Sequence, residues 1–350
     1  MSSRATTSIR RSVGTAAPAL IVLAVLVAAL GSSGYVVTLV GFAAIYGIFC
    51  TGLNFFMGYT GQASFGQNAF AALGGYGTAI LTATYDWEPL AAFFASMALA
   101  GLVAAIVGYP TLRLRGHYLA MATFALGLIT YEISIEWSGL TQGYMGYSGI
   151  PPLGLGRFTL DTDKSQLVAM VAVMLLGVWI ATRLRDSRFG RALRSIAGSE
   201  PAAQALGVDV ARYKLVAFVI AAMFASASGS LFAHFVGFIS PEVFGGAMVI
   251  QSFTMLFLGG IGTTWGPILG ALIVSVLPEM LRGLKEFQDV AFSVILIVVL
   301  IYAPKGLFAA LGQAYAALTG RRDDERPAPE SLPMSPASPP APAPAAGPLR

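Results

Sequence analysis

Long apolar runs, separated by short polar or glycine-rich stretches, repeat along most of the chain. The hydrocarbon core of a bilayer is about 30 Å thick, so a helix needs roughly 20 apolar residues to cross it. By this length criterion, the pattern predicts an all-α, polytopic membrane helical bundle of about ten spans. The expected spans are 13–30, 36–57, 68–84, 90–110, 117–136, 166–182, 213–235, 246–258, 267–281 and 289–303.

Composition supports a membrane protein. Apolar residues make up 56% of the chain and charged residues only 11%, whereas soluble proteins carry roughly 25% charged residues. The single cysteine, Cys50, excludes a disulfide framework, and the distant pair His117 and His234 argues against a histidine metal site. We therefore expect no metal and no cofactor, and we attribute the net charge of +4 to loops oriented by the membrane rather than to nucleic-acid binding.

The N-terminal segment, residues 1–35, contains the first expected span. Arg4, Arg10 and Arg11 precede its apolar run and small residues follow it, which also fits a cleaved signal peptide. An uncleaved helix is favoured because no soluble mature protein follows. Residues 36–310 form the expected transmembrane domain. Residues 321–350 are rich in proline and alanine, and we expect a disordered cytoplasmic tail.

The distribution of basic residues predicts the orientation. With the N-terminus placed in the cytoplasm and the spans alternating, both termini lie inside. Cytoplasmic segments then hold every lysine and arginine except Arg157, Lys164, Arg282 and Lys285.

Motifs for enzymatic chemistry are missing from the sequence. It has no P-loop for ATP, no zinc-protease helix motif and no nucleophile elbow, so no catalytic residue is predicted. Glu132 and Glu136 share one helix face, where a proton relay is conceivable. An interfacial position is favoured, because both lie close to the outer end of their span. For His234, also near an outer end, we expect a structural role.

A polar, glycine-rich stretch covering residues 54–77, called here the first break, interrupts the apolar pattern. Non-helical backbone at membrane depth is tolerated where it lines a cavity or is buried in protein, and such segments form binding sites in transporters. An ordinary cytoplasmic loop is the alternative, although the stretch has no charge. Hydroxyls on the 117–136 span either line the same pathway or bond to their own helix. The candidate pathway residues are Tyr59, Thr60, Gln62, Ser64, Gln67, Asn68, Thr123 and Thr130.

A second uncharged, glycine-rich stretch over residues 257–273, the second break, joins the eighth and ninth expected spans. Gly262, Gly266 and Gly270 form two overlapping G-x-x-x-G steps. Small residues let membrane helices approach closely, so this spacing favours helix packing.

The basic segment 187–215 holds a short predicted helix. Ser199 is a plausible N-cap, Glu200 and Pro201 suit the first turn, and Gly207 is a natural stop after Leu206. Such a helix is suited to docking a cytoplasmic partner that hydrolyses ATP. The alternative is an interfacial helix lying on anionic lipid.

These motifs together resemble permeases of high-affinity branched-chain amino-acid ABC importers, of the LivM type. The resembling stretches are 58–70, 112–127, 140–152, 187–208, 257–271, 277–282 and 302–307. Within 200–207 the sequence is similar to the coupling motif of ABC importer permeases, an acid, two alanines and a glycine. Pro201 separates the acid from the alanines, and in the outer loop Gln142, Tyr144 and Met145 depart from the family's small residues.

The resemblance implies a function and a set of partners. It implies a non-catalytic permease subunit in the bacterial inner membrane, paired with a second, related permease, two cytoplasmic ATPases and an external substrate-binding protein. The residues it implies for coupling to the ATPase are Ser199, Glu200, Ala202, Ala203 and Gly207. The cargo would be branched-chain or related small amino acids, or, as in similar family members, urea and short amides. An ion-coupled secondary carrier is the alternative of another class, and it would depend on Glu132.

Overall fold

The computed structural model describes residues 22, 24–32, 34–155, 158–160, 162–302 and 306. The expectations for the first 21 residues and for the tail over 321–350 lie outside this part of the chain. The described residues fall within one compact unit, Met1–Ala310.

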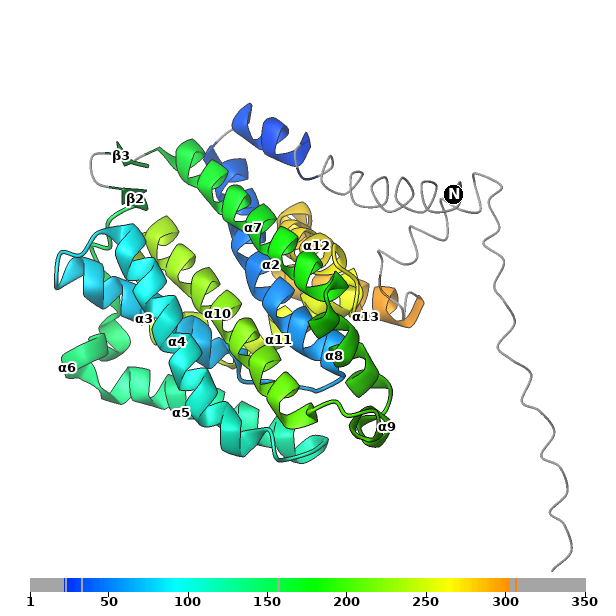
Figure 1. The fold of residues 1–350 in the computed structure, drawn as a ribbon. Helices are drawn as coiled ribbons and strands as arrows, with labels where there is room; N and C mark the ends of the chain where they lie inside the picture. The colour runs from blue at the N-terminus through cyan, green and yellow to red at the C-terminus, as the bar shows by residue number, and fades with distance from the viewer. Residues whose placement is uncertain are drawn as a thin grey trace, which may run out of the picture. The chain divides into compact units, whose positions relative to one another are not determined.

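Long helices form the body of the described chain (Figure 1). They coincide closely with the runs predicted from the apolar pattern. The helices are α2 (Gly34–Thr60), α3 (Gln67–Ala83), α4 (Pro89–Thr111), α5 (His117–Glu136), α7 (Asp163–Asp186), α10 (Val210–Val236), α11 (Gly246–Gly259), α12 (Gly266–Met280) and α13 (Gln288–Tyr302).

The all-α membrane bundle is confirmed, whereas the expected number of spans is not. Among the described residues, five helices are long and apolar enough to cross a membrane: α2, α4, α5, α7 and α10. The helices α3, α11, α12 and α13 occupy expected spans but have only 17, 14, 15 and 15 residues. The glycine-rich breaks shorten three of them, because α3, α11 and α12 each border a break.

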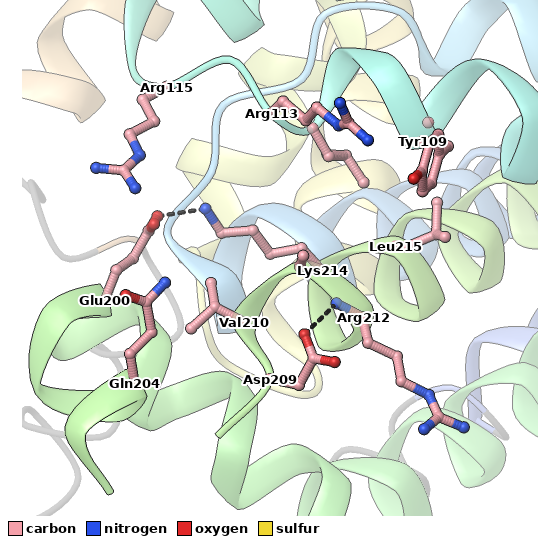
Figure 2. A pocket seen from close by; sticks show the side chains of 13 residues that line it. Tyr109, Arg113, Arg115, Glu200, Gln204, Asp209, Val210, Arg212, Lys214 and Leu215 are labelled. Atoms are coloured by element: carbon pink, nitrogen blue, oxygen red, sulfur yellow. Dashed lines mark hydrogen bonds and ion pairs between the residues drawn. The ribbon is translucent and has the colours of Figure 1, made fainter. Parts of the chain in front are cut away.

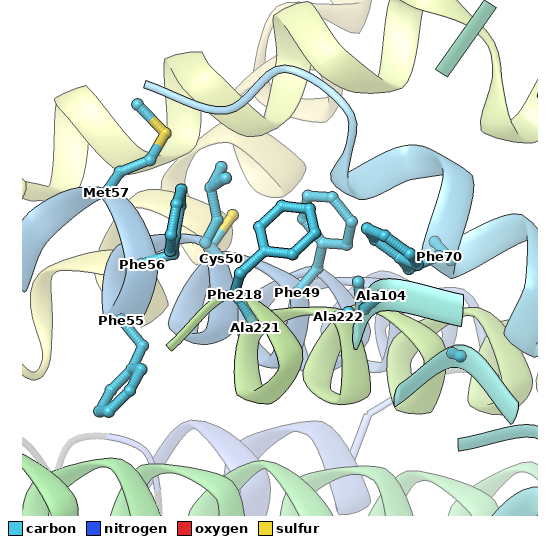
Figure 3. Packing of buried hydrophobic residues seen from close by; sticks show 14 of the residues in the cluster. Phe49, Cys50, Phe55, Phe56, Met57, Phe70, Ala104, Phe218, Ala221 and Ala222 are labelled. Carbon is cyan, nitrogen blue, oxygen red and sulfur yellow. The ribbon is translucent and has the colours of Figure 1, made fainter. Parts of the chain in front are cut away.

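Two long helices, α2 and α10, form the centre of the bundle. They pack against each other, α10 also packs against α3 and α4, and α2 also packs against α7 and α12. Phe218 of α10 lies at the middle of an aromatic cluster (Figure 3), with ring centroids 5.3 Å from Phe56 and 5.4 Å from Phe70. Lipid tails are as apolar as these side chains, so close packing rather than water exclusion holds such helices together.

Glycines bring several helix backbones into direct contact. A Cβ atom at Gly229 of α10 would stand 1.9 Å from the carbonyl oxygen of Ala71 in α3. Conversely, a Cβ atom at Gly74 of α3 would stand 2.1 Å from the carbonyl oxygen of Ser226. The α3–α10 crossing therefore depends on glycine at both positions.

The predicted packing glycines divide into two groups. Gly266 and Gly270 belong to α12, and a Cβ atom at Gly270 would meet the Met255 carbonyl oxygen of α11 at 1.8 Å. Gly262 instead lies in the loop before α12, with a φ of +78°. Its backbone conformation, which side chains rarely adopt, explains a glycine there better than helix packing does.

Short elements cover the ends of the bundle. They are α6 (Ser138–Thr141), η1 (Gly143–Met145), β1 (Tyr147–Ser148), β2 (Gly154–Leu155), β3 (Phe158–Thr159), α8 (Arg188–Gly198), α9 (Glu200–Ala205), β4 (Phe238–Ile239), η2 (Pro241–Phe244) and η3 (Arg282–Phe287). The antiparallel pairs are β1 with β4, where Tyr147 faces Ile239, and β2 with β3. Figure 1 places β2 and β3 at one end and α9 at the other.

Candidate functional site

The short helix predicted after Ser199 is present as α9. The Ser199 hydroxyl accepts a hydrogen bond from the backbone N–H of Ala202, at 3.4 Å, and so caps the helix N-terminus. The helix ends at Ala205, one residue earlier than expected. The chain then turns through Gly207, whose φ of +82° is a left-handed conformation that favours glycine.

Glu200, the first residue of α9, points back into the protein (Figure 2). Its carboxylate accepts a hydrogen bond from Gln62 Nε2 at 3.1 Å and forms an ion pair with Lys214 Nζ. Lys214 lies in α10 and is only 2% exposed. Three separate elements, the first break, α9 and α10, are thereby joined through one carboxylate. The sequence analysis missed Lys214, although a lysine inside the first turns of an apolar span was a signal for a buried partner.

The opposite face of α9 is exposed and uncharged. Ala203 is buried, but Ala202 and Ala205 are exposed, and Leu206, directly after the helix, is 82% exposed. Small residues without charge leave a smooth surface against which another protein can pack closely.

Helix α8 connects α9 to the centre of the bundle. Leu193 and Ile196 are fully buried. The ring of Phe189 stacks between Phe55 of α2, at 6.2 Å, and Tyr213 of α10, at 5.4 Å. A displacement of α8 would therefore press on both central helices.

The two glycine-rich breaks contact each other. The side-chain amide of Asn54, in α2, donates to the Thr263 carbonyl oxygen at 2.7 Å and accepts from the Gly262 N–H at 2.7 Å. A Cβ atom at Gly58 would approach the Gly262 nitrogen to 2.7 Å. Asn54 began the polar stretch in the sequence analysis but was not among its candidate residues, because no local pattern shows which distant backbone it meets.

The predicted pathway residues do not form a single surface. Tyr59 and Thr60 are buried near the end of α2, where the Thr60 hydroxyl donates to the Phe56 carbonyl oxygen at 2.7 Å. Gln62 is engaged by Glu200. The hydroxyl of Thr130 donates to the Leu126 carbonyl oxygen of its own helix at 2.9 Å.

A second group, Ser64, Gln67 and Asn68, is gathered where α3 begins. All three are buried, and Asn68 Nδ2 donates to the Phe244 carbonyl oxygen at 2.8 Å. Ser64 Oγ and both amide atoms of Gln67 have no hydrogen-bond partner among the described residues. Thr123 of α5 holds this region in place, because its hydroxyl accepts the Phe65 N–H at 3.0 Å. Buried polar atoms without partners are costly unless a ligand or conformational change satisfies them.

An apolar cavity of about 780 Å³ adjoins this group, between α5 and α11. Its lining includes Phe65, Ala120, Phe124, Val249, Phe253 and Phe257. The rings of Phe65 and Phe253 stack at 4.4 Å, nearly parallel at 10°. Both rings also line a small void whose walls include Ser64, Gln67 and Asn68. The stacked pair thus separates an apolar surface from an uncharged polar cluster.

Glu132, Glu136 and His234 lie toward the end of the bundle away from α9. Glu132 and Glu136 are exposed on α5. His234 is buried, and its Nδ1 lies 2.7 Å from the Pro151 carbonyl oxygen, which ties α10 to the loop after α5. Among the described residues no group of histidine, cysteine, aspartate or glutamate is arranged to hold a metal ion.

Comparison with known proteins gives one consistent result. The family model described as "Branched-chain amino acid transport system / permease component" matches residues 35–304. The permease protein LivM of the high-affinity branched-chain amino acid transport system is 33% identical over 316 residues in Escherichia coli, covering 83% of this chain and 73% of the relative. The Salmonella typhimurium LivM protein is 32% identical over 290 residues, covering 75% and 67%. LivH of Salmonella typhimurium is 27% identical over 302 residues, covering 79% and 92%.

Proposed function

The chain belongs to the family of branched-chain amino acid transport system permease components, and from this premise we propose that it carries branched-chain or related small amino acids inward through a bacterial inner membrane, driven by ATP hydrolysis on partner subunits. The observation that carries the proposal is the extent of the match, which runs through every described helix from α2 to α13. The permease itself is non-catalytic.

The proposed assembly contains a second, related permease, two cytoplasmic ATPases and an external binding protein. The chain is similar to proteins named LivM and also to proteins named LivH, which supports a pair of related permeases. The end of the bundle with α8 and α9 carries most of the described arginines, so the positive-inside rule favours the cytoplasmic side for that end. We propose that both termini lie on the same side.

Coupling to ATP hydrolysis is assigned to α9. An ATPase subunit would pack on the exposed face around Ala202 and Leu206, and its movement would reach the bundle through two links. The first is the carboxylate of Glu200 on Lys214, and the second is the stack of Phe189 between α2 and α10. These links join α9 and α8 to the two central helices, α2 and α10.

The translocation pathway is assigned to the cavity that α5 and α11 line together. The apolar cavity suits an aliphatic side chain, and the amides of Gln67 and Asn68 offer donors and acceptors to the two charges of an amino acid. Opening the Phe65–Phe253 stack would bring the two surfaces together. No buried side-chain charge is needed, because uncharged groups and helix termini suffice for a small zwitterion.

Transport assays test this function directly. The chain is produced with the products of the neighbouring reading frames and reconstituted in vesicles, and uptake of labelled leucine is followed. We expect uptake to require ATP and the binding protein, and unlabelled valine or isoleucine to compete more strongly than urea or acetamide. Stronger competition by urea would indicate that the cargo is a short amide and not a branched-chain amino acid. Uptake by the chain alone, driven by a proton or sodium gradient and lost in Glu132→Gln, would establish a secondary carrier.

Replacement of Gln67 with leucine separates a transport role from a structural one. Leucine has a similar size, and removing amide atoms that lack partners is expected to leave the thermal unfolding midpoint unchanged or slightly higher. Transport is expected to fall about tenfold, which corresponds to one lost hydrogen bond to a charged group, about 1.4 kcal/mol. Thr130→Val is the matched control, since that hydroxyl bonds only within its own helix. Full uptake in the leucine variant would remove Gln67 from the pathway.

Substitutions of Gly207 test the docking helix. In Gly207→Val the left-handed turn after α9 becomes strained by roughly 1–2 kcal/mol, whereas Gly207→Asn tolerates it better. No atom lies within 4 Å of the position a Cβ would take, so neither variant is expected to disturb packing. We expect the valine variant to lose stimulation of ATP hydrolysis by loaded binding protein and the asparagine variant to keep most of it. Equal activity in both would show that the turn has no part in coupling.

A further inference from the structure

A basic cavity of about 570 Å³ lies beside α9, bounded by the end of α4, the turn into α5 and the start of α10 (Figure 2). Four cationic side chains line it, against two carboxylates, those of Glu200 and Asp209. The four are Arg113, Arg115, Arg212 and Lys214. None of the functions assigned above uses Arg113 or Arg115.

The two carboxylates are already engaged. Glu200 pairs with Lys214, and Asp209 Oδ1 accepts the backbone N–H of Arg212 at 3.1 Å as the N-cap of α10. The Arg113 guanidinium lies over the ring of Tyr109, 4.7 Å from its centroid. Neither ion pair in the described part of the chain involves Arg113 or Arg115. These two guanidinium groups are thus placed to bind an anion that the chain itself does not provide.

The approach to the cavity is apolar. Leu99, Leu102, Ile106 and Tyr109 are all exposed and follow one face of α4 at intervals of three or four residues. Tyr109, the last of them, lines the cavity, and so does the half-buried Leu215 of α10. A ligand that fits both parts has an anionic head and apolar chains running along α4.

We infer that this cavity binds the phosphate headgroup of an anionic membrane lipid, with its acyl chains lying on the exposed face of α4. Guanidinium groups bind phosphate through paired hydrogen bonds, and basic pockets between membrane helices on the cytoplasmic side are suited to anionic headgroups. Gln204 and Glu200 of α9 line the same cavity. A bound headgroup would therefore touch the proposed docking helix and stabilise its position. The inference rests on the proposed orientation, but not on the cargo.

Lipid titration of the purified full chain tests the inference. Phosphatidylglycerol or phosphatidylcholine is added to the protein in detergent, and retained lipid is counted by native mass spectrometry while thermal unfolding is followed in parallel. We expect half-saturation with phosphatidylglycerol at a concentration at least about tenfold below that for phosphatidylcholine. Arg113→Gln combined with Arg115→Gln should raise the half-saturating concentration of phosphatidylglycerol about twenty-five-fold, since each basic group near an anionic lipid contributes roughly fivefold.

The matched control removes the same charge from the same end of the bundle. Arg188→Gln combined with Arg194→Gln alters two exposed arginines of α8, which lie outside the cavity lining. We expect the control to change half-saturation less than about twofold, because the lost charges do not face the headgroup. An equal loss of phosphatidylglycerol affinity in both double variants would mean that the lipid is held only by diffuse attraction to the charged surface. This result would overturn the inference.

Two further arms separate the lipid from other anionic partners. Inorganic phosphate at millimolar concentration is not expected to displace phosphatidylglycerol, and full displacement would assign the cavity to a small soluble phosphate. The Arg113 and Arg115 variant is also tested for co-purification with the ATPase subunits. Loss of those subunits with an unchanged lipid titration would make the cavity a protein contact instead. Lipid binding needs no transport, so failure of the importer proposal and failure of this inference give different results.

Discussion

Glu200→Ala is expected to abolish ATP-driven uptake and to destabilise the protein by about 2–3 kcal/mol. The substitution leaves the ammonium group of Lys214, 2% exposed, without its carboxylate. Removing one partner of a buried ion pair costs about 3–5 kcal/mol. We expect a smaller loss, about 2–3 kcal/mol, because the Glu200 side chain is 20% exposed and water already screens part of the interaction. Thermal unfolding and uptake of labelled leucine measure the two effects.

The double variant Glu200→Ala, Lys214→Met separates stability from coupling. Without either charge the buried cost disappears, and a well-packed apolar pair is often as stable as the ion pair. We expect the unfolding midpoint to return close to the original value. If the link from α9 to α10 transmits movement, uptake stays low while the protein regains its stability. Recovery of uptake together with stability would contradict a coupling role and leave the pair as a structural feature.

The local structure around α9 could be predicted because its signals lie within a few residues. Ser199 caps the helix, and Gly207 ends it, through interactions with immediate neighbours. The same holds for the long helices, whose apolar runs need no information about their partners. The prediction of about ten spans is not confirmed by helix length, because hydropathy measures apolarity and not how long a helix is. Beside the breaks, α11 and α12 remain apolar although they are only 14 and 15 residues long.

The contacts that define the candidate site are not local. Asn54 meets Gly262 across 208 positions of sequence, and Glu200 meets Lys214 only because α9 folds back against the start of α10. The stacked rings of Phe65 and Phe253 come from the first break and α11. A polar stretch in an apolar chain indicates that some partner exists, as it did for both breaks. It does not identify the partner, because single-sequence patterns have no information on which helices cross.

The close contact between α3 and α10 was missed for the same reason. The sequence analysis favoured Gly262, Gly266 and Gly270 for packing because their spacing forms a recognisable motif, but the α3–α10 crossing uses one glycine from each helix. Gly74 belongs to a glycine pair, GG, in α3, and Gly229 belongs to a run of small residues, ASASGS, in α10. Such runs were the available signal, since small side chains concentrate where membrane helices touch.

Gly229→Ala is therefore expected to be among the most damaging single-methyl changes in the bundle. The added Cβ would stand 1.9 Å from the Ala71 carbonyl oxygen and cannot move away by rotation, because both atoms are fixed to backbone. Separating α3 from α10 also disturbs the hydrogen bond from Ser230 Oγ to the Gly74 carbonyl oxygen, at 2.9 Å. We expect a loss of about 3 kcal/mol or more and little folded protein.

The control for this prediction is Gly246→Ala, at the start of α11, where no atom lies within 4 Å of the new methyl group. Alanine is a better helix former than glycine, so this variant should be neutral or slightly more stable. Yield of monodisperse protein and the unfolding midpoint in detergent compare the two variants. Equal midpoints would mean that α3 and α10 can separate at little cost. The crossing would then be a flexible joint rather than a fixed contact of the bundle.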